Sequence, residues 1–163
     1  SAAFATTVTT FCGQNYGARQ IKRTFGCARA SMLQGCTVYA IVIVICYIFA
    51  APIMGLFVTD AEVINLGVYI IRNFMPWYML SIIMEIIMGA LRGLGDVKIP
   101  TAISVGFLLI QRIPWLIWIM PIYMTHSCLI QSYYVTWILA LAILIPYYFF
   151  RKHKTKKKFE NIA

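Results

Sequence analysis

The chain has 163 residues, of which 61% are hydrophobic and only 12% are charged, and its formal net charge is +9. Soluble domains carry about a quarter charged residues, whereas residues 30–59 and 113–150 of this chain contain no Asp, Glu, Lys or Arg. Both stretches are longer than the roughly 20 apolar residues with which a helix crosses a bilayer. The composition therefore excludes an ordinary soluble domain and predicts an integral membrane protein.

The first residues of the chain predict the end of a helix. Residues 1–11 are small and uncharged, and they show no signal-peptide pattern. The segment is too short to cross a bilayer by itself. We expect it to be the inner end, or stump, of a helix that begins upstream in a longer protein.

Four complete membrane spans follow the stump. They are predicted over residues 32–57, 66–91, 99–121 and 131–150, and a basic tail occupies residues 151–163. Apolar residues run continuously through these segments instead of alternating as they do in barrel strands, so the spans are predicted to be helices. The predicted fold class is all-α: one polytopic membrane helix bundle over residues 1–163.

Basic residues occur only in alternate connections between the spans. Residues 19–29 hold four, residues 92–98 hold two and the tail holds six, whereas the connections near residues 60 and 126 hold none. The positive-inside rule places the basic segments in the cytoplasm. Because the basic tail directly follows an apolar run, a membrane flank is favoured over nucleic-acid binding.

Two prolines lie deep within predicted spans. Pro76 and Pro114 each remove a backbone donor from their helix. Neighbouring groups can satisfy the freed carbonyl in a membrane protein. We expect local kinks at both positions, and ordinary helix irregularity is favoured over a functional hinge.

Two polar segments interrupt the apolar runs at the predicted cytoplasmic turns. The first, FCGQNYGARQIKR, covers residues 11–23, and the second, GALRGLGDVKIP, covers residues 89–100. Each places glycines, a polar side chain and basic side chains directly after an apolar helix. Neither ends in the GK[ST] sequence of a phosphate-binding loop, so we interpret both as helix connections.

The second segment contains the features of a tight turn between two helices. Gly93 and Gly95 permit the turn at the helix end. Arg92 and Lys98 are expected to anchor the inner membrane interface. Pro100 suits the first turn of the following helix.

Together the two segments resemble the multidrug and toxic compound extrusion (MATE) transporters. GQNYGA at residues 13–18 is similar to the turn after the second helix of a MATE six-helix half, and LRGLGD at residues 91–96 resembles the turn after the fourth helix of the C-terminal half. Two spans separate the segments, as the family requires. The residues that carry the resemblance are Gly13, Gln14, Asn15, Gly17, Arg92, Gly93, Gly95, Asp96 and Pro100.

The resemblance implies a fold and a function. The fold has about twelve helices in two lobes around a central cavity, and this chain would supply part of the C-terminal lobe, with a missing N-terminal lobe as its partner. The implied function is a secondary antiporter of the plasma membrane, surrounded by membrane lipids. It would export organic, often cationic, compounds in exchange for H⁺ or Na⁺ and would need no cofactor besides the coupling ion.

Two other functions stay open. A lipid-linked oligosaccharide flippase of the same superfamily is one, because the fold alone does not determine the substrate. Such a flippase is expected to show more cavity Arg and Lys side chains, which would bind pyrophosphate. The other is a membrane scaffold fragment without transport activity.

Glu85 is the candidate coupling residue. It lies seven residues before Arg92, or roughly 10 Å above the inner interface at 1.5 Å per residue. A charge near the bilayer centre costs about 2.5 to 3.5 kcal/mol or more, so it usually faces protein and function. We interpret Glu85 as a proton or cation site, and the alternative is an ion pair between helices. Helical spacing puts these residues on its face: Tyr78, Ser81, Ile82, Met88 and Gly89.

Other residues bear on the assignment of Glu85 as the coupling residue. The MATE resemblance implies an acidic residue on this helix, at Glu85 or about one turn away near Ser81. Arg112 lies roughly 21 Å up the third span and is the natural partner of Glu85, although their nominal depths differ by roughly 10 Å. Direct pairing and separate positions both stay open. Arg72, near the outer end of the second span, is expected to extend to the interface.

Aromatic and methionine side chains are abundant, and each group has two interpretations. An interfacial belt is favoured over a drug-binding cage for Trp115, Trp118, Tyr123, Tyr133 and Tyr134. Core packing is favoured over adaptable substrate binding for Met75, Met79, Met84 and Met88.

The sequence predicts neither a metal site nor an enzyme. The five cysteines form no CxxC pair and have no His partner at metal spacing. They are expected to be free thiols. No nucleophile with an adjacent base is apparent, so enzymatic activity is not expected.

Overall fold

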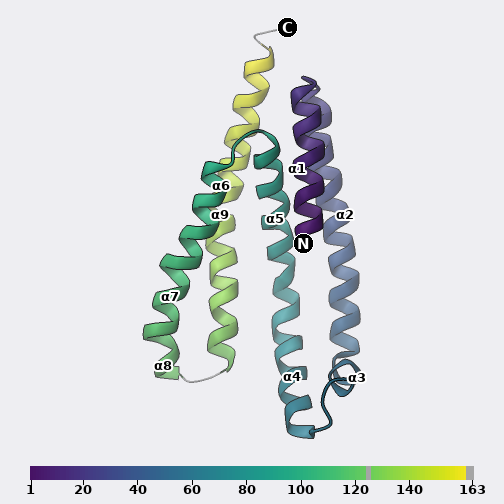
Figure 1. The fold of residues 1–163 in the computed structure, drawn as a ribbon, viewed down its shortest axis with the longest axis vertical. Helices are drawn as coiled ribbons and strands as arrows, with labels where there is room; N and C mark the ends of the chain where they lie inside the picture. Colours follow the sequence, from purple (N-terminus) through teal and green to yellow (C-terminus); the bar gives the residue numbers. More distant parts are fainter. Residues whose placement is uncertain (124–125, 161–163) are drawn as a thin grey trace.

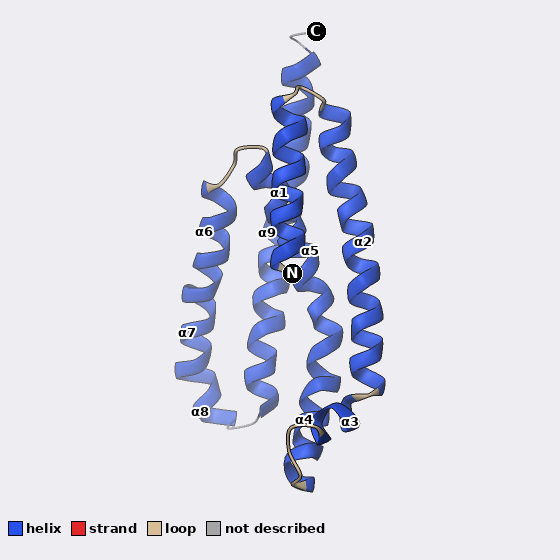
Figure 2. Cartoon of the chain, turned by 45° about the vertical axis from the view of Figure 1, so that its right-hand side comes forward, coloured by secondary structure: helices blue, strands red, loops and turns tan. Residues whose placement is uncertain are grey.

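The computed structural model describes residues 1–123 and 126–160, and all regular structure within those ranges is helical (Figures 1 and 2). This confirms the predicted all-α fold class for the described residues. The helices are α1 (Ala2–Gly17), α2 (Ile21–Ile48), α3 (Ala50–Gly55), α4 (Ala61–Phe74), α5 (Tyr78–Gly93), α6 (Lys98–Gly106), α7 (Arg112–Pro114), α8 (Met120–Tyr123) and α9 (His126–Glu160).

Within the described residues, four helical segments are long and apolar enough to cross a membrane, as predicted. They are Ile21–Ile48, Ala61–Gly93, Lys98–Ile122 and Cys128–Glu160. The second joins α4 and α5 through a 3-10 turn, and the third joins α6, α7 and α8 through two π-helical turns. The chain is therefore a multi-pass membrane protein.

The first span is displaced from its predicted bounds. The prediction was residues 32–57, but α2 ends at Ile48 and the short helix α3 follows it. Pro52 explains the break, because its nitrogen cannot donate to the Ile48 carbonyl and its ring would clash with that carbonyl. At the other end, α2 begins at Ile21, because the basic segment before residue 32 continues the same helix.

The predicted tail is also helical. The fourth span was predicted to end at residue 150, but α9 continues without interruption to Glu160. Lysine and arginine are good helix formers, so the change from apolar to basic residues ends the apolar stretch without ending the helix. Residues 161–163 of the predicted tail lie outside the described residues.

The helices pack around α5. One buried cluster joins α5 to α1 and α2 through residues such as Ile82, Ile86 and Val8. A second joins α5 to α9 through residues such as Leu91, Leu141 and Leu144. Figure 1 shows α6 to α8 on the far side of α9 from α2. α5 is therefore the central helix of the bundle.

Both predicted proline sites show altered helix geometry. Pro76 lies in the 3-10 turn Met75–Trp77 between α4 and α5. Pro114 ends α7, which lies between the π-helical turns Phe107–Gln111 and Trp115–Ile119. The missing proline donor accounts for a local change in the hydrogen-bond pattern at each site.

All three basic segments gather at one end of the bundle, which we call the basic end. Figure 1 shows the α1–α2 turn, the α5–α6 turn and the C-terminal part of α9 at this end. The α3–α4 connection, the end of α8 and the start of α9 lie at the opposite end. The arrangement agrees with the alternation of basic residues in the sequence.

We expect the basic end to face the cytoplasm, and cysteine labelling tests this orientation. Cys128 is a poor reporter because its side chain is only 4% exposed. Thr59 in the α3–α4 connection and Lys157 in the last turn of α9 are both exposed. These two segments lie at opposite ends of the bundle. In intact cells, a membrane-impermeant thiol reagent should label Thr59→Cys above the unsubstituted background, and Lys157→Cys only after permeabilisation. The reverse pattern would invert the proposed topology.

Candidate functional site

Glu85 lies in the middle of α5, half-buried, between two cavities. The first, which we call the α5–α9 cavity, has a volume of about 300 Å³. The second, which we call the α1 cavity, has a volume of about 340 Å³ and is lined on the α1 side by small residues that include Thr6 and Thr9. Glu85 and Arg92 line both cavities, since they lie two turns apart on one face of α5.

The α5–α9 cavity combines charged, aromatic and flexible apolar side chains. Its charged residues come from α5 and α7, and most of its aromatic residues come from α9. The lining residues are Met84, Glu85, Met88, Arg92, Ser104, Phe107, Arg112, Tyr133, Thr136, Trp137 and Ala140. Ligand sites in proteins have this character, being mostly apolar with a few converging polar groups.

The structure brings Glu85 and Arg112 to the same cavity without joining them. The ion pair recorded among the described residues is that of Arg151 with Asp96, and none links Glu85 to Arg112. Arg112 instead places its guanidinium carbon 3.9 Å from the ring centroid of Tyr133, as in a cation–π contact. The sequence left open whether Glu85 and Arg112 pair directly or occupy separate positions. The structure shows separate positions without an ion pair.

The predicted face around Glu85 is divided among different neighbours. Met88 lines the α5–α9 cavity beside Glu85. Ile82 packs in the core against α1 and α2, and Ser81 is buried without lining either cavity. Tyr78 lies outside both linings, but its ring is 5.4 Å from that of Trp137. Glu85 and Met88 thus border the cavity, and Tyr78 supports one of its walls.

The aromatic wall of the α5–α9 cavity comes largely from α9. Tyr133 and Trp137 lie one turn apart, and the ring of Phe74 is 5.2 Å from Tyr133 and 5.8 Å from Trp137. Tyr133 was predicted in an interfacial belt, whereas it lines the cavity beneath Arg112. Trp118 is 70% exposed, as a belt residue should be. The side chain of Tyr123 lies outside the described part of the chain.

Polar residues of the third and fourth spans were missed by the sequence analysis. Thr136 contacts the side-chain oxygen of Gln111, at the end of the first π-helical turn, and the carbonyl of Ser132. Among the described residues, the amide nitrogen of Gln111 is buried without a hydrogen-bond partner. A Gln directly before Arg112 was the available sequence signal.

The family-motif glycines have different roles, and Gly93 serves helix packing. A Cβ atom on Gly93 would lie 2.7 Å from Cys12 Cβ and 2.8 Å from the Thr9 carbonyl oxygen, so α1 and α5 approach closely. Gly93 is the last residue of α5, as expected for the helix end, and it also allows α1 to pack closely. Gly95 does form the turn, with φ of +81°. At the end of α1, Arg19 and not Gly17 takes the positive φ, of 59°.

The polar motif residues connect helices at the basic end. Asn15 donates from Nδ2 to the Phe11 carbonyl at 2.8 Å and to Cys27 Sγ at 3.6 Å, which links α1 to α2. Gln14 borders a surface pocket between the same helices. Pro100 is buried in the first turn of α6, as predicted.

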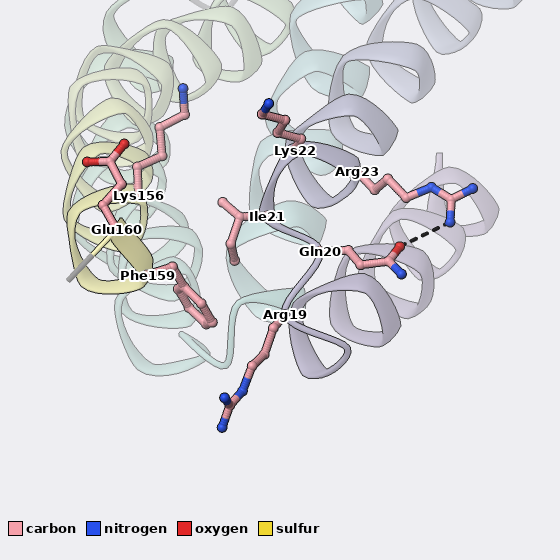
Figure 3. A pocket seen from close by; sticks show the side chains of 8 residues that line it. All are labelled: Arg19, Gln20, Ile21, Lys22, Arg23, Lys156, Phe159 and Glu160. Atoms are coloured by element: carbon pink, nitrogen blue, oxygen red, sulfur yellow. Dashed lines mark hydrogen bonds between the residues drawn. The ribbon is translucent and has the colours of Figure 1, made fainter. Parts of the chain in front are cut away.

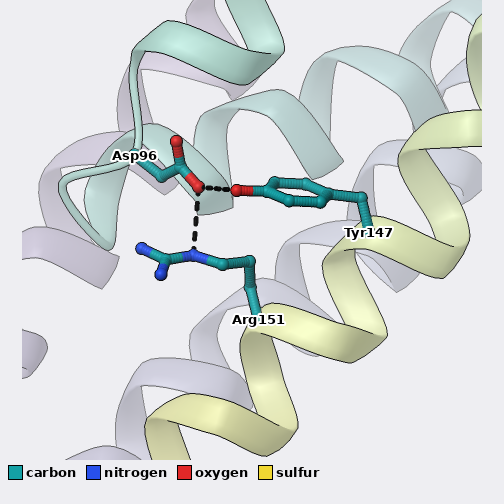
Figure 4. Close-up of polar contacts among 3 residues, drawn as sticks. All are labelled: Asp96, Tyr147 and Arg151. Carbon is teal, nitrogen blue, oxygen red and sulfur yellow. Dashed lines mark hydrogen bonds and ion pairs between the residues drawn. The ribbon is translucent and has the colours of Figure 1, made fainter.

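Asp96 holds the α5–α6 turn against α9. Its carboxylate accepts a hydrogen bond from the Tyr147 hydroxyl and lies 3.0 Å from Arg151 Nε (Figure 4). The Asp96 side chain is 11% exposed and that of Arg151 is 27% exposed, so the pair is only partly screened by solvent. The acidic residue of the LRGLGD motif thus has a structural partner on α9.

Comparison with known proteins identifies the family. The MatE family model matches residues 1–118, which include both sequence motifs and the residues Glu85, Arg92 and Arg112. No curated protein matches the chain. MatE proteins are membrane transporters and not, in general, enzymes. Since the match covers well over half of the chain, this protein belongs to the MatE family.

Proposed function

We propose that the protein is a secondary antiporter that exports organic, often cationic, compounds in exchange for H⁺ or Na⁺. The observation that carries the proposal is the position of Glu85. This carboxylate lies half-buried between two cavities and has no ion-pair partner among the described residues. A carboxylate in a membrane segment that is not neutralised by a partner is a candidate for binding a proton or a cation.

The lining of the α5–α9 cavity supports an organic substrate. Trp137 offers an aromatic face, to which a ligand cation is attracted. Met84 and Met88 offer flexible apolar surface, which can adapt to substrates of different shape. Alternating access needs two lobes around one site, so we further propose that an N-terminal lobe completes the cavity.

A flippase for a lipid-linked oligosaccharide is the second candidate. The sequence placed only Arg112 well inside the membrane, but Arg92 lines the same cavity. Two arginines could bind a pyrophosphate group, because guanidinium groups recognise phosphate in a bidentate manner. Glu85 in the same cavity opposes this function, since its charge would repel the phosphates.

Transport by the full-length protein in proteoliposomes tests the proposal. One pH unit supplies about 1.4 kcal/mol, so one-for-one exchange of H⁺ for a monovalent organic cation should support a gradient of about tenfold. Collapse of the membrane potential should leave that gradient unchanged. For a neutral compound, a 100 mV potential adds about 2.3 kcal/mol, and the gradient should reach about 500-fold.

Three outcomes of this assay separate the candidates. A gradient that follows Na⁺ and not pH would identify the other coupling ion. Movement of a fluorescent lipid pyrophosphate, without any movement of organic cations, would favour the flippase. Absence of both activities in a correctly folded protein would contradict the transport proposal.

A further inference from the structure

A further pocket opens at the basic end, far from Glu85. It has a volume of about 560 Å³ and lies between the α1–α2 turn and the last turns of α9 (Figure 3). Four of its residues are basic and one is acidic, so it carries an excess of positive charge. The lining residues are Arg19, Gln20, Ile21, Lys22, Arg23, Lys156, Phe159 and Glu160.

Packing holds the two walls of this basic pocket together. The ring of Phe159 on α9 meets that of Tyr16 on α1 edge-on, with centroids 5.7 Å apart. One turn earlier on α9, Thr155 is only 6% exposed. Lys152 Nζ lies 5.5 Å from the ring centroid of Phe25, which is itself 5% exposed on α2. The basic end of α9 is therefore docked against the α1–α2 turn.

The pocket's lysines are available to bind an anion. Arg23 donates to the Gln20 side chain at 3.0 Å, whereas no ion pair is recorded for Lys22, Lys156 or Glu160 in the described part of the chain. Figure 3 shows the ammonium groups of Lys22 and Lys156 extending in the same direction from opposite walls, with Ile21 between them. Glu160 therefore does not neutralise the charge of either lysine through an ion pair in the described residues.

The depth of the pocket favours a lipid headgroup over a soluble anion. Lys156 lies six residues beyond Phe150, the last residue of the apolar run, which is about 9 Å along a helix. The headgroup layer begins where the hydrocarbon core ends and is about 5 to 8 Å thick on each side, so the long Lys156 side chain can extend back into it. Ile21 and Phe159 add apolar lining to the charged groups, which suits the boundary between a headgroup and its acyl chains.

From this placement we propose that the basic pocket binds the phosphate-bearing headgroup of an anionic phospholipid. Lys22 and Lys156 reach the phosphate from the two walls, and the other basic side chains at the rim raise the local anion concentration. A bound headgroup would thereby tie α9 to the α1–α2 turn. This inference does not depend on the transported substrate.

Lipid binding to the full chain in detergent, measured by native mass spectrometry, tests this inference. The probes are dioleoyl phosphatidylcholine, dioleoyl phosphatidylserine and phosphatidylinositol 4-phosphate. The two anionic lipids should be retained more strongly than phosphatidylcholine. Lys22→Gln combined with Lys156→Gln should weaken their binding about 30-fold, because each basic residue near an anionic surface contributes about fivefold.

The matched control is Lys154→Gln combined with Lys157→Gln. Both lysines are exposed on α9 and lie outside the pocket, and the charge removed is the same. The control should weaken binding by less than about threefold. An equal loss in both double variants would overturn the proposal in favour of diffuse attraction, and so would equal retention of all three lipids.

A further arm separates a lipid from a soluble anion. Inorganic phosphate or inositol 1-phosphate, at the lipid concentration, should not displace the bound lipid. Displacement by either would overturn the assignment to a lipid headgroup. The single variant Lys156→Gln, with its helicity checked by circular dichroism, serves if the double variant fails to fold. It should lose about fivefold in affinity, and wild-type affinity would contradict the proposal.

Discussion

Replacing Glu85 by glutamine is expected to abolish ion-coupled efflux by the full-length protein while its membrane abundance stays unchanged. Glutamine has the same shape as glutamate but cannot bind and release a proton or hold a cation by charge. No described residue forms an ion pair with Glu85, so the substitution strands no buried partner charge. Efflux of an organic cation and protein abundance should be measured in the same cells.

Glu62→Gln is the matched control for this experiment. It removes the same charge from an exposed position in the first turn of α4, away from both cavities. Its efflux should stay near that of the unsubstituted protein. Full efflux in Glu85→Gln would contradict the coupling role, and a loss of abundance together with efflux would point to a structural role for the carboxylate.

A double-mutant cycle separates a coupling carboxylate from an ion-pair partner. Arg112 forms a cation–π contact with Tyr133, and no ion pair with Glu85 is recorded among the described residues. The coupling energy between Glu85→Gln and Arg112→Gln should therefore stay well below the roughly 3 to 5 kcal/mol that breaking a buried ion pair costs. A larger coupling energy would indicate that the two side chains pair during part of the transport cycle.

Membrane solvation explains why the spans could be predicted. Long apolar runs such as residues 113–150 predict membrane-spanning helices, because the backbone must satisfy its own hydrogen bonds in lipid. The bounds were less accurate, since apolarity marks the bilayer and not the helix. α2 stops at Ile48 because of Pro52, and α9 continues through its lysines to Glu160.

The cavity was only partly predictable. Glu85 was found because a charge within an apolar run is conspicuous. The α9 residues that line the same cavity, Tyr133, Thr136 and Trp137, were not predicted there. Their position depends on how α9 is rotated against α5. The two π-helical turns add a change of register to the third span, so the direction of Arg112 does not follow from regular helical spacing.

The close approach of α1 and α5 did have a sequence signal. Gly89 and Gly93 are spaced as GxxxG, the pattern with which membrane helices pack closely. From the sequence, Gly93 was assigned to the turn that follows and Gly89 to the face around Glu85. In the structure, Thr9 Oγ1 donates to the Gly89 carbonyl at 3.1 Å, and the Gly89 position has Ala5 as its nearest neighbour.

Gly93→Ala is expected to destabilise the full-length protein by about 1 to 3 kcal/mol, the usual cost of overpacking. The new methyl group would lie 2.7 Å from Cys12 Cβ and 2.8 Å from the Thr9 carbonyl oxygen, so α1 must move away. Alanine forms helices better than glycine by about 1 kcal/mol, which offsets only part of this cost. Thermal unfolding in detergent should show a lower midpoint temperature.

Gly26→Ala and Gly13→Ala supply the contrast that isolates packing from helix propensity. A Cβ on Gly26 meets nothing within 4 Å, so its alanine variant should be neutral or more stable. A Cβ on Gly13 would lie 3.5 Å from the Gly93 carbonyl oxygen, an ordinary contact, and should also be tolerated. Equal stabilisation of Gly93→Ala and Gly26→Ala would contradict the close α1–α5 contact. Destabilisation confined to position 93 would assign that glycine of the LRGLGD motif to helix packing, because both control glycines gain the same helix propensity without the clash.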